Sequence, residues 1–397
     1  MNIQKSSLGV LLIAGVNVSV INSVLAEPAI TDYQEATSSY EDAYITGNFN
    51  LNSGNQDQAS YDLDLTIDYE KVFSSPSRNI KLDFLGIGSR SRGPQKNDPT
   101  QSDYQASGSV TMDSYFQPNS KGTFWYGKAE AGVKKGQKDP FSKLTGGMGF
   151  GHVVNVTPMA RSIRLIQGLR KRGSLTRDPL NITYQNIATI IDKEGEYVSK
   201  YGSNDYEEYW IEAIEKELKK SGFVKGKGDL GARAILKSYT ILVKERISTR
   251  KKGWLARAGI GVVLSNYDGG DSKPVLEIGA EYHHPINNVA QFSNEAVYSA
   301  TFDDNNNGFN FNNTMSLTYE LSDRVDWENQ WKLDHSKSDI SNNITSNTVS
   351  SSFRYYLNNQ LNFDVTAKLH DTEDNIRNNN NDELDKSLTM GITYRLK

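Results

Sequence analysis

Histidines and closely spaced carboxylates are the side chains of this sequence that could do acid–base or metal chemistry. The five histidines are scattered along the chain: His152, His283, His284, His335 and His370. The adjacent pair, His283 and His284, would point to opposite faces of a strand, so the two rings cannot bind one metal ion together. The sequence contains no HExxH, no P-loop and no nucleophile-elbow motif. We therefore expect no enzyme activity, no cofactor and no metal site.

The elements that position these residues are predicted from alternation. Residues 61–69 read Tyr-Asp-Leu-Asp-Leu-Thr-Ile-Asp-Tyr, apolar or aromatic at every odd position and polar at every even one. Period-two alternation places the two sets on opposite faces of one β-strand. The same division recurs in residues 361–370 and 387–396. A soluble sandwich shows the same two rows. Strands this long, in a chain that also carries an N-terminal secretory signal, favour a membrane barrel.

Turn-forming clusters of Gly, Pro, Asn and Asp divide the alternating stretches into strands. Six strands are expected before residue 157, at 41–53, 58–72, 78–89, 102–116, 121–134 and 142–155. Eight are expected after residue 252, at 253–267, 273–284, 288–303, 308–321, 324–336, 345–357, 359–371 and 384–396. The fold class predicted is an all-β transmembrane antiparallel barrel of about 14 strands, an even number as in single-chain bacterial barrels.

The connections alternate in length, which predicts the topology. The short ones are Ser74–Ser77, Pro118-Asn119, Pro285–Asn287, Ser322-Asp323 and Asn358-Asn359. Most of the connections between them are longer. Membrane barrels have short periplasmic turns and long extracellular loops. This rhythm places both termini and the segment 157–252 on the periplasmic side.

The segment 157–252 interrupts the barrel pattern with helical spacing. Thr157-Pro158 is a helix start, and apolar residues then recur every three or four positions. Further helices are expected at 180–200, 206–221 and 230–250, although residues 239–243 are also compatible with a strand. The sequence therefore predicts an α-helical domain inserted between strands six and seven.

Charge distinguishes this insert from the rest of the chain. It contains 20 Lys and Arg against 12 Asp and Glu, a net +8. The whole chain carries −4 and Lys5 contributes +1, so the remaining mature chain carries −13. The basic residues gather at the two ends of the insert, where we expect docking at the barrel mouth: Arg161, Arg164, Arg170, Lys171, Arg172, Arg250, Lys251 and Lys252. A solvated basic face of a helical domain is the alternative explanation.

The N-terminus has the form of a secretory signal. Lys5 precedes the mostly apolar run 8–21, and Val24-Leu25-Ala26 resembles a cleavage site. The expected organisation is a signal peptide at 1–26, a patternless periplasmic leader at 27–40, barrel strands at 41–156, the insert at 157–252 and barrel strands at 253–397. The sequence has no cysteine, which excludes disulfides and thiolate metal sites. The net charge of −4 argues against a nucleic-acid partner.

Taken together, the export signal, the alternating strands, the loop rhythm and the terminal Gly-Ile-Thr-Tyr-Arg-Leu-Lys resemble a Gram-negative outer-membrane β-barrel protein of the porin-like class. The resemblance covers the strands and not the insert. It implies location in the outer membrane and contact with outer-membrane lipid. Barrels of this class usually end on an aromatic residue, whereas this chain has Tyr394 followed by Leu396 and Lys397.

A barrel of about 14 strands is wide enough to hold water. The polar rows predict a lumen lined by Asp62, Asp64, Asp68, Arg257, Glu277, Glu281, Arg354, Asp364, Lys368 and Arg395. A lining of mixed charge can bias ion selectivity, or it can brace the interior.

Three functions are compatible with this scaffold. The first is a pore or export conduit whose basic insert gates the lumen or docks a periplasmic protein, an anionic glycan or a lipid headgroup. The second is a barrel-anchored interaction or structural protein whose pore is closed. The third is a rim hydrolase, because Asp62-x-Asp64 and Asp334-His335 lie near strand ends, as in outer-membrane proteases. The sequence does not indicate the transported substrate or the oligomeric state.

Overall fold

The computed structural model of the chain describes residues 28–33, 38–117, 122–226, 229–267, 269–270, 272–303, 307–338, 343–374, 376 and 383–396. The expected signal peptide at 1–26, part of the expected leader and the turn at Pro118-Asn119 lie outside these residues.

Fourteen antiparallel strands form a closed barrel in which each strand pairs with its neighbours in the chain and β14 pairs with β1. Their bounds are β1 Ser38–Asn52, β2 Ser60–Ser75, β3 Arg78–Arg92, β4 Thr100–Tyr115, β5 Thr123–Lys134, β6 Phe141–Asn155, β7 Lys251–Ser265, β8 Lys273–Pro285, β9 Ala290–Thr301, β10 Gly308–Ser322, β11 Val325–Ser338, β12 Ile344–Tyr356, β13 Leu361–Glu373 and β14 Asp385–Arg395. The predicted fold class and strand number are confirmed. The observed barrel begins at Ser38 and resumes at Lys251, a few residues earlier than expected in both places.

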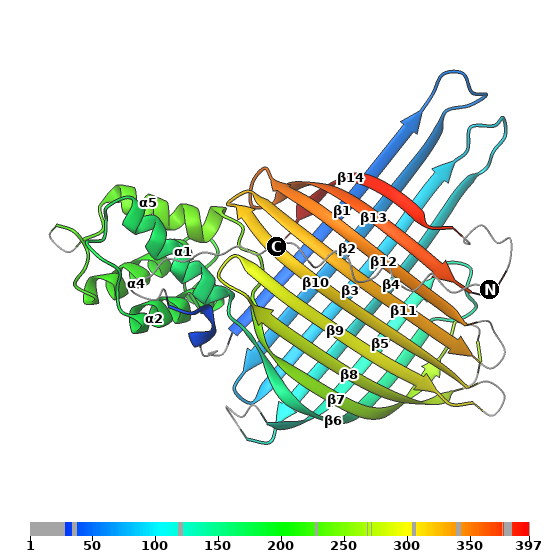
Figure 1. Ribbon diagram of the computed structural model, residues 1–397, viewed down its shortest axis with the longest axis horizontal. Helices are drawn as coiled ribbons and strands as arrows, with labels where there is room; N and C mark the ends of the chain where they lie inside the picture. Colours follow the sequence, from blue (N-terminus) through cyan, green and yellow to red (C-terminus); the bar gives the residue numbers. More distant parts are fainter. Residues whose placement is uncertain are drawn as a thin grey trace, which may run out of the picture.

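The helices all lie at one end of the barrel (Figure 1). They are α1 Thr157–Lys171, α2 Asn181–Asp192, α3 Glu194–Tyr201, α4 Tyr206–Lys220, α5 Ala232–Tyr239 and the π-helix η2 Thr240–Lys244. We refer to residues 157–244 as the helical domain. None of the described helices is long and apolar enough to cross a membrane. The turns β2–β3, β8–β9, β10–β11 and β12–β13 reach the same end, because strand direction alternates around the ring.

Alternation separates the two surfaces of the wall. On β2 the odd row carries the exposed Leu63 and Leu65, and on β14 the even row carries Leu388, Met390 and Ile392. The strand registers place these rows on the outside of the barrel, where they form an apolar belt. The complementary rows face the lumen and are mostly polar. An apolar outer surface on a closed sheet is what a bilayer requires, since every backbone group must be paired within the protein.

Trp210 lies at the centre of the helical domain. Its side chain is fully buried, and its indole Nε1 donates to the carbonyl of Ile190 at 2.8 Å. The core around it is contiguous and apolar, and it includes Met159, Ile166 and Ile187. This packing makes the insert a folded domain with its own core.

The leader is part of that domain, which differs from the patternless segment expected. Residues Ile30–Asp32 form a short 3-10 helix, η1, and Ile30 packs in the same core. The hydroxyl of Tyr33 donates to Asp192 Oδ2 at 2.6 Å. Two further expectations are corrected: the helix expected at 180–200 is divided into α2 and α3, and the helix expected at 230–250 ends at Lys244.

Aromatic side chains fill the lumen beside β6 and β7. Tyr115, Phe124, Tyr126 and Leu255 form a buried cluster on the inner surface. Phe124 lies directly over Gly149, where an added Cβ would come within 2.3 Å of the ring. The absence of a side chain on β6 therefore gives the ring its place, and the barrel is packed rather than open along this part of its wall.

Candidate functional site

The residues that link the helical domain to β7 cross one mouth of the barrel. We call residues 245–250 the strap. Near its start Arg246 Nη2 donates to the hydroxyl of Tyr44 on β1, at 2.5 Å, and lies 3.5 Å from Asp42 Oδ2. At its end the chain enters β7, which stands halfway around the ring from β14, the neighbour of β1. The strap therefore spans the opening from one wall to the other.

Glu320, at the end of β10, binds the strap and the first helix together. Its Oε1 accepts from Arg250 Nη2 at 2.7 Å and from the backbone N–H of Ser248 at 3.0 Å. Its Oε2 accepts from Arg164 on α1. The side chains of Arg250 and Glu320 are only 0% and 2% exposed. We refer to Glu320, Arg250 and Arg164 as the latch.

A second contact holds the middle of the strap. The Ser248 hydroxyl donates to Asp326 Oδ2 on β11 at 2.5 Å, and the Tyr356 hydroxyl donates to the same oxygen at 2.8 Å. A cavity of about 240 Å³ lies beneath these contacts, between the strap and the wall. The strap thus covers hollow space at the mouth.

The arginines of the strap are held in a charged but poorly solvated setting. Burial disfavours the charge of Arg246, but Tyr44 and Asp42 outweigh burial and raise the pKa of the guanidinium above its usual range. Burial lowers the pKa of Arg250 from its ordinary value, although Glu320 opposes the effect. Among the described residues, Arg250 Nε and Arg164 Nη1 are buried without a hydrogen-bond partner. A buried ion pair that is incompletely hydrogen-bonded is a weak source of stability.

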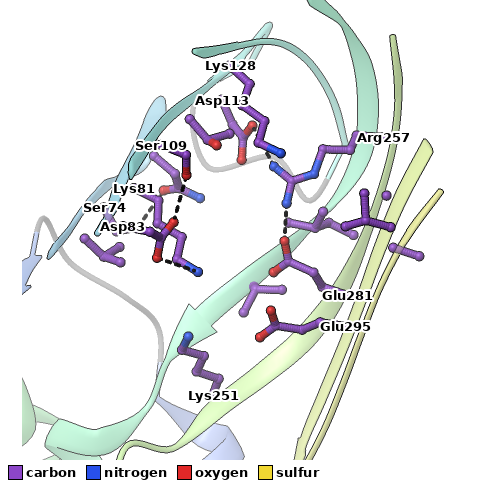
Figure 2. Close-up of a pocket in the computed structure, with 18 of the residues that line it drawn as sticks. Ser74, Lys81, Asp83, Ser109, Asp113, Lys128, Lys251, Arg257, Glu281 and Glu295 are labelled. Atoms are coloured by element: carbon purple, nitrogen blue, oxygen red, sulfur yellow. Dashed lines mark hydrogen bonds and ion pairs between the residues drawn. The ribbon is translucent and has the colours of Figure 1, made fainter. Parts of the chain in front are cut away.

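A cluster of alternating charges continues from the mouth into the lumen. Glu277 accepts from Lys143 at 2.6 Å and from Lys128 at 3.3 Å. A cavity of about 220 Å³ lies in front of this part of the wall. Figure 2 shows Lys81 and Lys251 on one side of that cavity, and Arg257 with Glu281 across it. The charges are largely paired with one another, so the lumen carries mixed polarity and not a single sign.

All ten residues predicted to line the lumen belong to rows that the strand registers turn inward. Six are held in pairs or clusters: Arg257 with Glu281, Glu277 with Lys128 and Lys143, Arg354 with Asp364, and Arg395 with Asp42. The other four, Asp62, Asp64, Asp68 and Lys368, are exposed.

The residues predicted to dock the insert have different partners in the structure. Arg164 and Arg250 contact the barrel. Lys251 and Lys252 are corrected, because they are the first residues of β7 and belong to the barrel itself; Lys251 lies 3.6 Å from Glu70 of β2. Lys252 Nζ donates to the carbonyl of Tyr33 at 2.9 Å and so binds the leader. Arg161 lies 3.6 Å from Glu194 within the insert, and burial lowers its pKa.

The expected position of Arg170, Lys171 and Arg172 is corrected. They lie at the far end of α1, about 20 Å along the helix from Thr157. Arg170 Nε donates to Asp178 at 2.9 Å, and the other two are exposed. Clustering in the sequence near one end of the insert did not place them near the mouth, because a helix carries the chain away from the barrel.

Three residues on the wall side of the site were not predicted from the sequence: Glu320, Asp42 and Asp326. Each is a carboxylate on an inward row near the helical end of its strand. That position was a usable signal, because acidic residues at a mouth that faces a basic insert are candidates for pairing with it.

The candidate rim hydrolase residues do not assemble. Asp334 and His335 are adjacent on β11, so their side chains point to opposite faces. His335 Nδ1 lies 2.8 Å from the Thr345 hydroxyl, and its ring contacts Phe309. No cluster of His, Asp and Glu suited to a metal ion occurs within the residues that the structure describes.

A closed antiparallel barrel with an apolar outer belt and a charged lumen defines a transmembrane β-barrel of the outer-membrane class, as the resemblance implied. Residues 244–356 match a family described as "Protein of unknown function, DUF481". No curated protein matches the chain.

Solved structures that resemble the chain include three outer-membrane proteins. A loop-deletion mutant of OmpT from Vibrio cholerae is 8% identical, with 90% of this chain and 99% of that chain covered and a TM-score of 0.32. An outer-membrane channel from Pseudomonas putida F1 is 5% identical, with coverages of 94% and 100% and a TM-score of 0.33. An anion-selective porin from Comamonas acidovorans is 8% identical, with coverages of 90% and 100% and a TM-score of 0.34.

Proposed function

We propose that this chain is an outer-membrane pore whose helical domain gates one mouth through the strap. In the closed state the strap lies across the opening, held by the latch and by Asp326. In the open state these contacts break and the strap leaves the mouth. The helical domain lies on the periplasmic side, the side of the short turns.

The observation that carries this proposal is the double occupation of Glu320. One carboxylate of the barrel wall binds an arginine of the strap and an arginine of α1. Breaking this single site frees two elements at once, which is a property of a gate. The unpaired Arg250 Nε and Arg164 Nη1 keep the closed state from being deeply stable.

A barrel-anchored interaction protein is the second candidate. Lys171 and Arg172 form an exposed basic end of α1, remote from the barrel and free to face the periplasm. An anionic partner bound there could pull on α1 and so act on Arg164, the member of the latch on the same helix. This version adds a partner to the gate, and it becomes the main function only if the barrel conducts in none of the variants below.

Glu320→Gln is the variant that tests the gate. It removes the charge that both arginines require and retains the shape of the side chain. Removing one partner of a buried ion pair costs about 3 kcal/mol, so we expect the ratio of open to closed time to rise roughly 100-fold. Single-channel recording in planar bilayers measures this ratio directly.

The matched control is Glu328→Gln. It removes the same charge from an inward position of the neighbouring strand β11 and leaves the latch intact. We expect its open-to-closed ratio to stay near that of the wild type. If Glu320→Gln and Glu328→Gln behave alike, the latch does not control conduction. If neither variant nor the wild type conducts, the interaction protein replaces the pore as the proposed function.

A further inference from the structure

The barrel is closed by an unusually short seam. β1 pairs with β14 over four residue pairs, from Tyr44–Arg395 to Gly47–Ile392. In contrast, β1 pairs with β2 over 15 residues and β14 pairs with β13 over 10. Beyond Gly47 and Ile392, no backbone pairing joins the two strands within the described residues. Figure 1 shows β1 and β14 diverging beyond this point.

A side chain ends the ladder at this point. With its amide oriented to donate, Asn48 Nδ2 binds the carbonyl of Met390 at 3.1 Å, in place of the next backbone rung. The Asn48 amide lies where the Cβ of a larger residue at position 391 would be, 2.5 Å from that point. Gly391 therefore leaves the space in which Asn48 separates the strands. The opening is specified by two residues and is not a frayed terminus.

The opening lies at the depth of the bilayer. On β1 the outward row carries Phe49, 65% exposed, and on β14 it carries Leu388, 66% exposed. Both residues belong to the unpaired edges, so the apolar belt continues along either side of the gap. Unpaired backbone edges are costly in hydrocarbon, and barrels ordinarily avoid them by closing completely. Because an unpaired edge at this depth is costly, we expect it to have a functional role or to bind a ligand.

The lumen offers an apolar surface in register with the closed seam, next to the point where the gap begins. Ile87 and Leu85 on β3 belong to its inward row and are 48% and 41% exposed. Ile87 pairs with Thr66, which pairs with Thr46, the residue opposite Thr393 in the seam. The patch is thus two strands, about 10 Å, from the seam, one residue pair before the last pair, Gly47 and Ile392, beyond which the gap begins. Exposed branched aliphatic side chains inside a polar lumen suit a hydrocarbon chain and not a hydrated ion.

We infer that the gap between β1 and β14 is a lateral portal through which the hydrocarbon chain of a bilayer-borne amphiphile enters the lumen and lies against Leu85 and Ile87. The polar head of the amphiphile passes along the inward residues of the two edges, among them Asn50 and Thr389. The portal adds a lipid-like ligand to the barrel and does not depend on the gate at the mouth.

The openness of the seam is tested by cysteine pairs, which the chain allows because it has no cysteine of its own. If the ladder continued, Asn50 would face Thr389. We expect Asn50→Cys with Thr389→Cys to form a disulfide at least roughly tenfold more slowly than Thr46→Cys with Thr393→Cys, because strands that have parted exceed the reach of a disulfide. The hydroxyls of the control pair lie 2.9 Å apart. Equal rates for the two pairs would show a closed seam and overturn the portal.

Contact with lipid is tested by a nitroxide on Thr389→Cys in vesicles of phosphatidylcholine. A portal predicts collisions with oxygen dissolved in the bilayer as well as with a water-soluble nickel chelate. The same label on Ser316→Cys, an inward residue of β10 in a fully paired part of the wall, should show a lower ratio of oxygen collisions to nickel-chelate collisions. Equal ratios for the Thr389 and Ser316 labels would contradict the portal.

Occupation is tested with cis-parinaric acid, a fluorescent fatty acid. We expect it to bind the wild type and to bind Ile87→Asn about tenfold more weakly, because a buried aliphatic contact is replaced by an amide. Cross-linking the Asn50 and Thr389 cysteines with a long thiol reagent should slow binding as well. Wild-type binding that neither change alters would place the fatty acid elsewhere and overturn the proposed site, as would no binding at all. A strand of another protein captured at the open edge would also overturn it.

Discussion

Replacing Trp210 by alanine is expected to unfold the helical domain while the barrel remains folded. Trp210 is fully buried, and its indole hydrogen bond to Ile190 is internal to the domain. Truncating a buried tryptophan costs about 4 kcal/mol, a large part of what a domain of this size has to lose. We expect the helical signal in circular dichroism to be lost at lower temperature, and the mobility of the unheated, folded barrel in gel electrophoresis to be unchanged.

The same variant tests whether the gate depends on the folded insert. An unfolded helical domain cannot hold α1 and its Arg164 against Glu320, so we expect channels with a longer open time than in the wild type. Leu236→Ala on α5 is the matched control, because Leu236 is 64% exposed and contributes little burial. A helical domain that melts together with the barrel in a single transition would contradict the view that the two parts are separate folding units.

Replacing Phe124 by alanine is expected to destabilise the barrel itself. The ring is fully buried against Tyr115, Tyr126 and Leu255, and it occupies the place left by Gly149. Removing it leaves a cavity that the rigid sheet cannot close, at a cost of about 3 to 5 kcal/mol. We expect the midpoint of urea unfolding to shift to a lower urea concentration. Unfolding is measured by the change in electrophoretic mobility between the folded and the unfolded barrel.

Gly149→Val tests the same contact from its other side. The added methyl groups would meet the Phe124 ring and the backbone of β7, so we expect defective assembly. Val133→Ala is the control for Phe124→Ala, since Val133 lies on the outward row of β5, the strand that carries Phe124. A Phe124→Ala barrel as stable as Val133→Ala would show that the aromatic cluster is not a structural element of the wall.

The barrel could be predicted from the sequence because its signal is local and repeated. Each strand alternates by itself, as residues 61–69 do, and the turns follow from Gly, Pro, Asn and Asp clusters. The inward position of Asp364 or Arg257 follows from the alternation of polar and apolar residues along its strand. Closure of the ring needed no further signal, because an open edge in a bilayer is costly.

The latch could not be predicted in the same way. Glu320 and Arg164 are 156 residues apart, and nothing local to either residue specifies the other. The expected helix 230–250 concealed the strap, because the sequence continues in an ambiguous apolar run after Tyr239. The structure ends the helix with a π-turn at Lys244 and then extends the chain, and only this extension lets Arg246 reach β1.

The short pairing between β1 and β14 could not be predicted from the sequence either. β14 alternates as regularly as any other strand, so the alternation predicts that it pairs with both neighbouring strands along its whole length. The glycine at position 391 does not by itself indicate that the strands separate there. Its role became visible only beside Asn48, a residue of the first strand that is brought to it when the ring closes.

The central claim, that the strap closes the mouth, is tested most directly by fixing the strap to the wall reversibly. The Ser248 hydroxyl lies 2.5 Å from Asp326 Oδ2, so Ser248→Cys with Asp326→Cys places two thiols within reach of each other or of a short thiol cross-linker. Single-channel current through this variant is measured before oxidation, after oxidation and after reduction. We predict frequent openings in the reduced form, their loss on cross-linking and their return on reduction. A current that is unchanged while the cross-link is demonstrably formed would contradict the account.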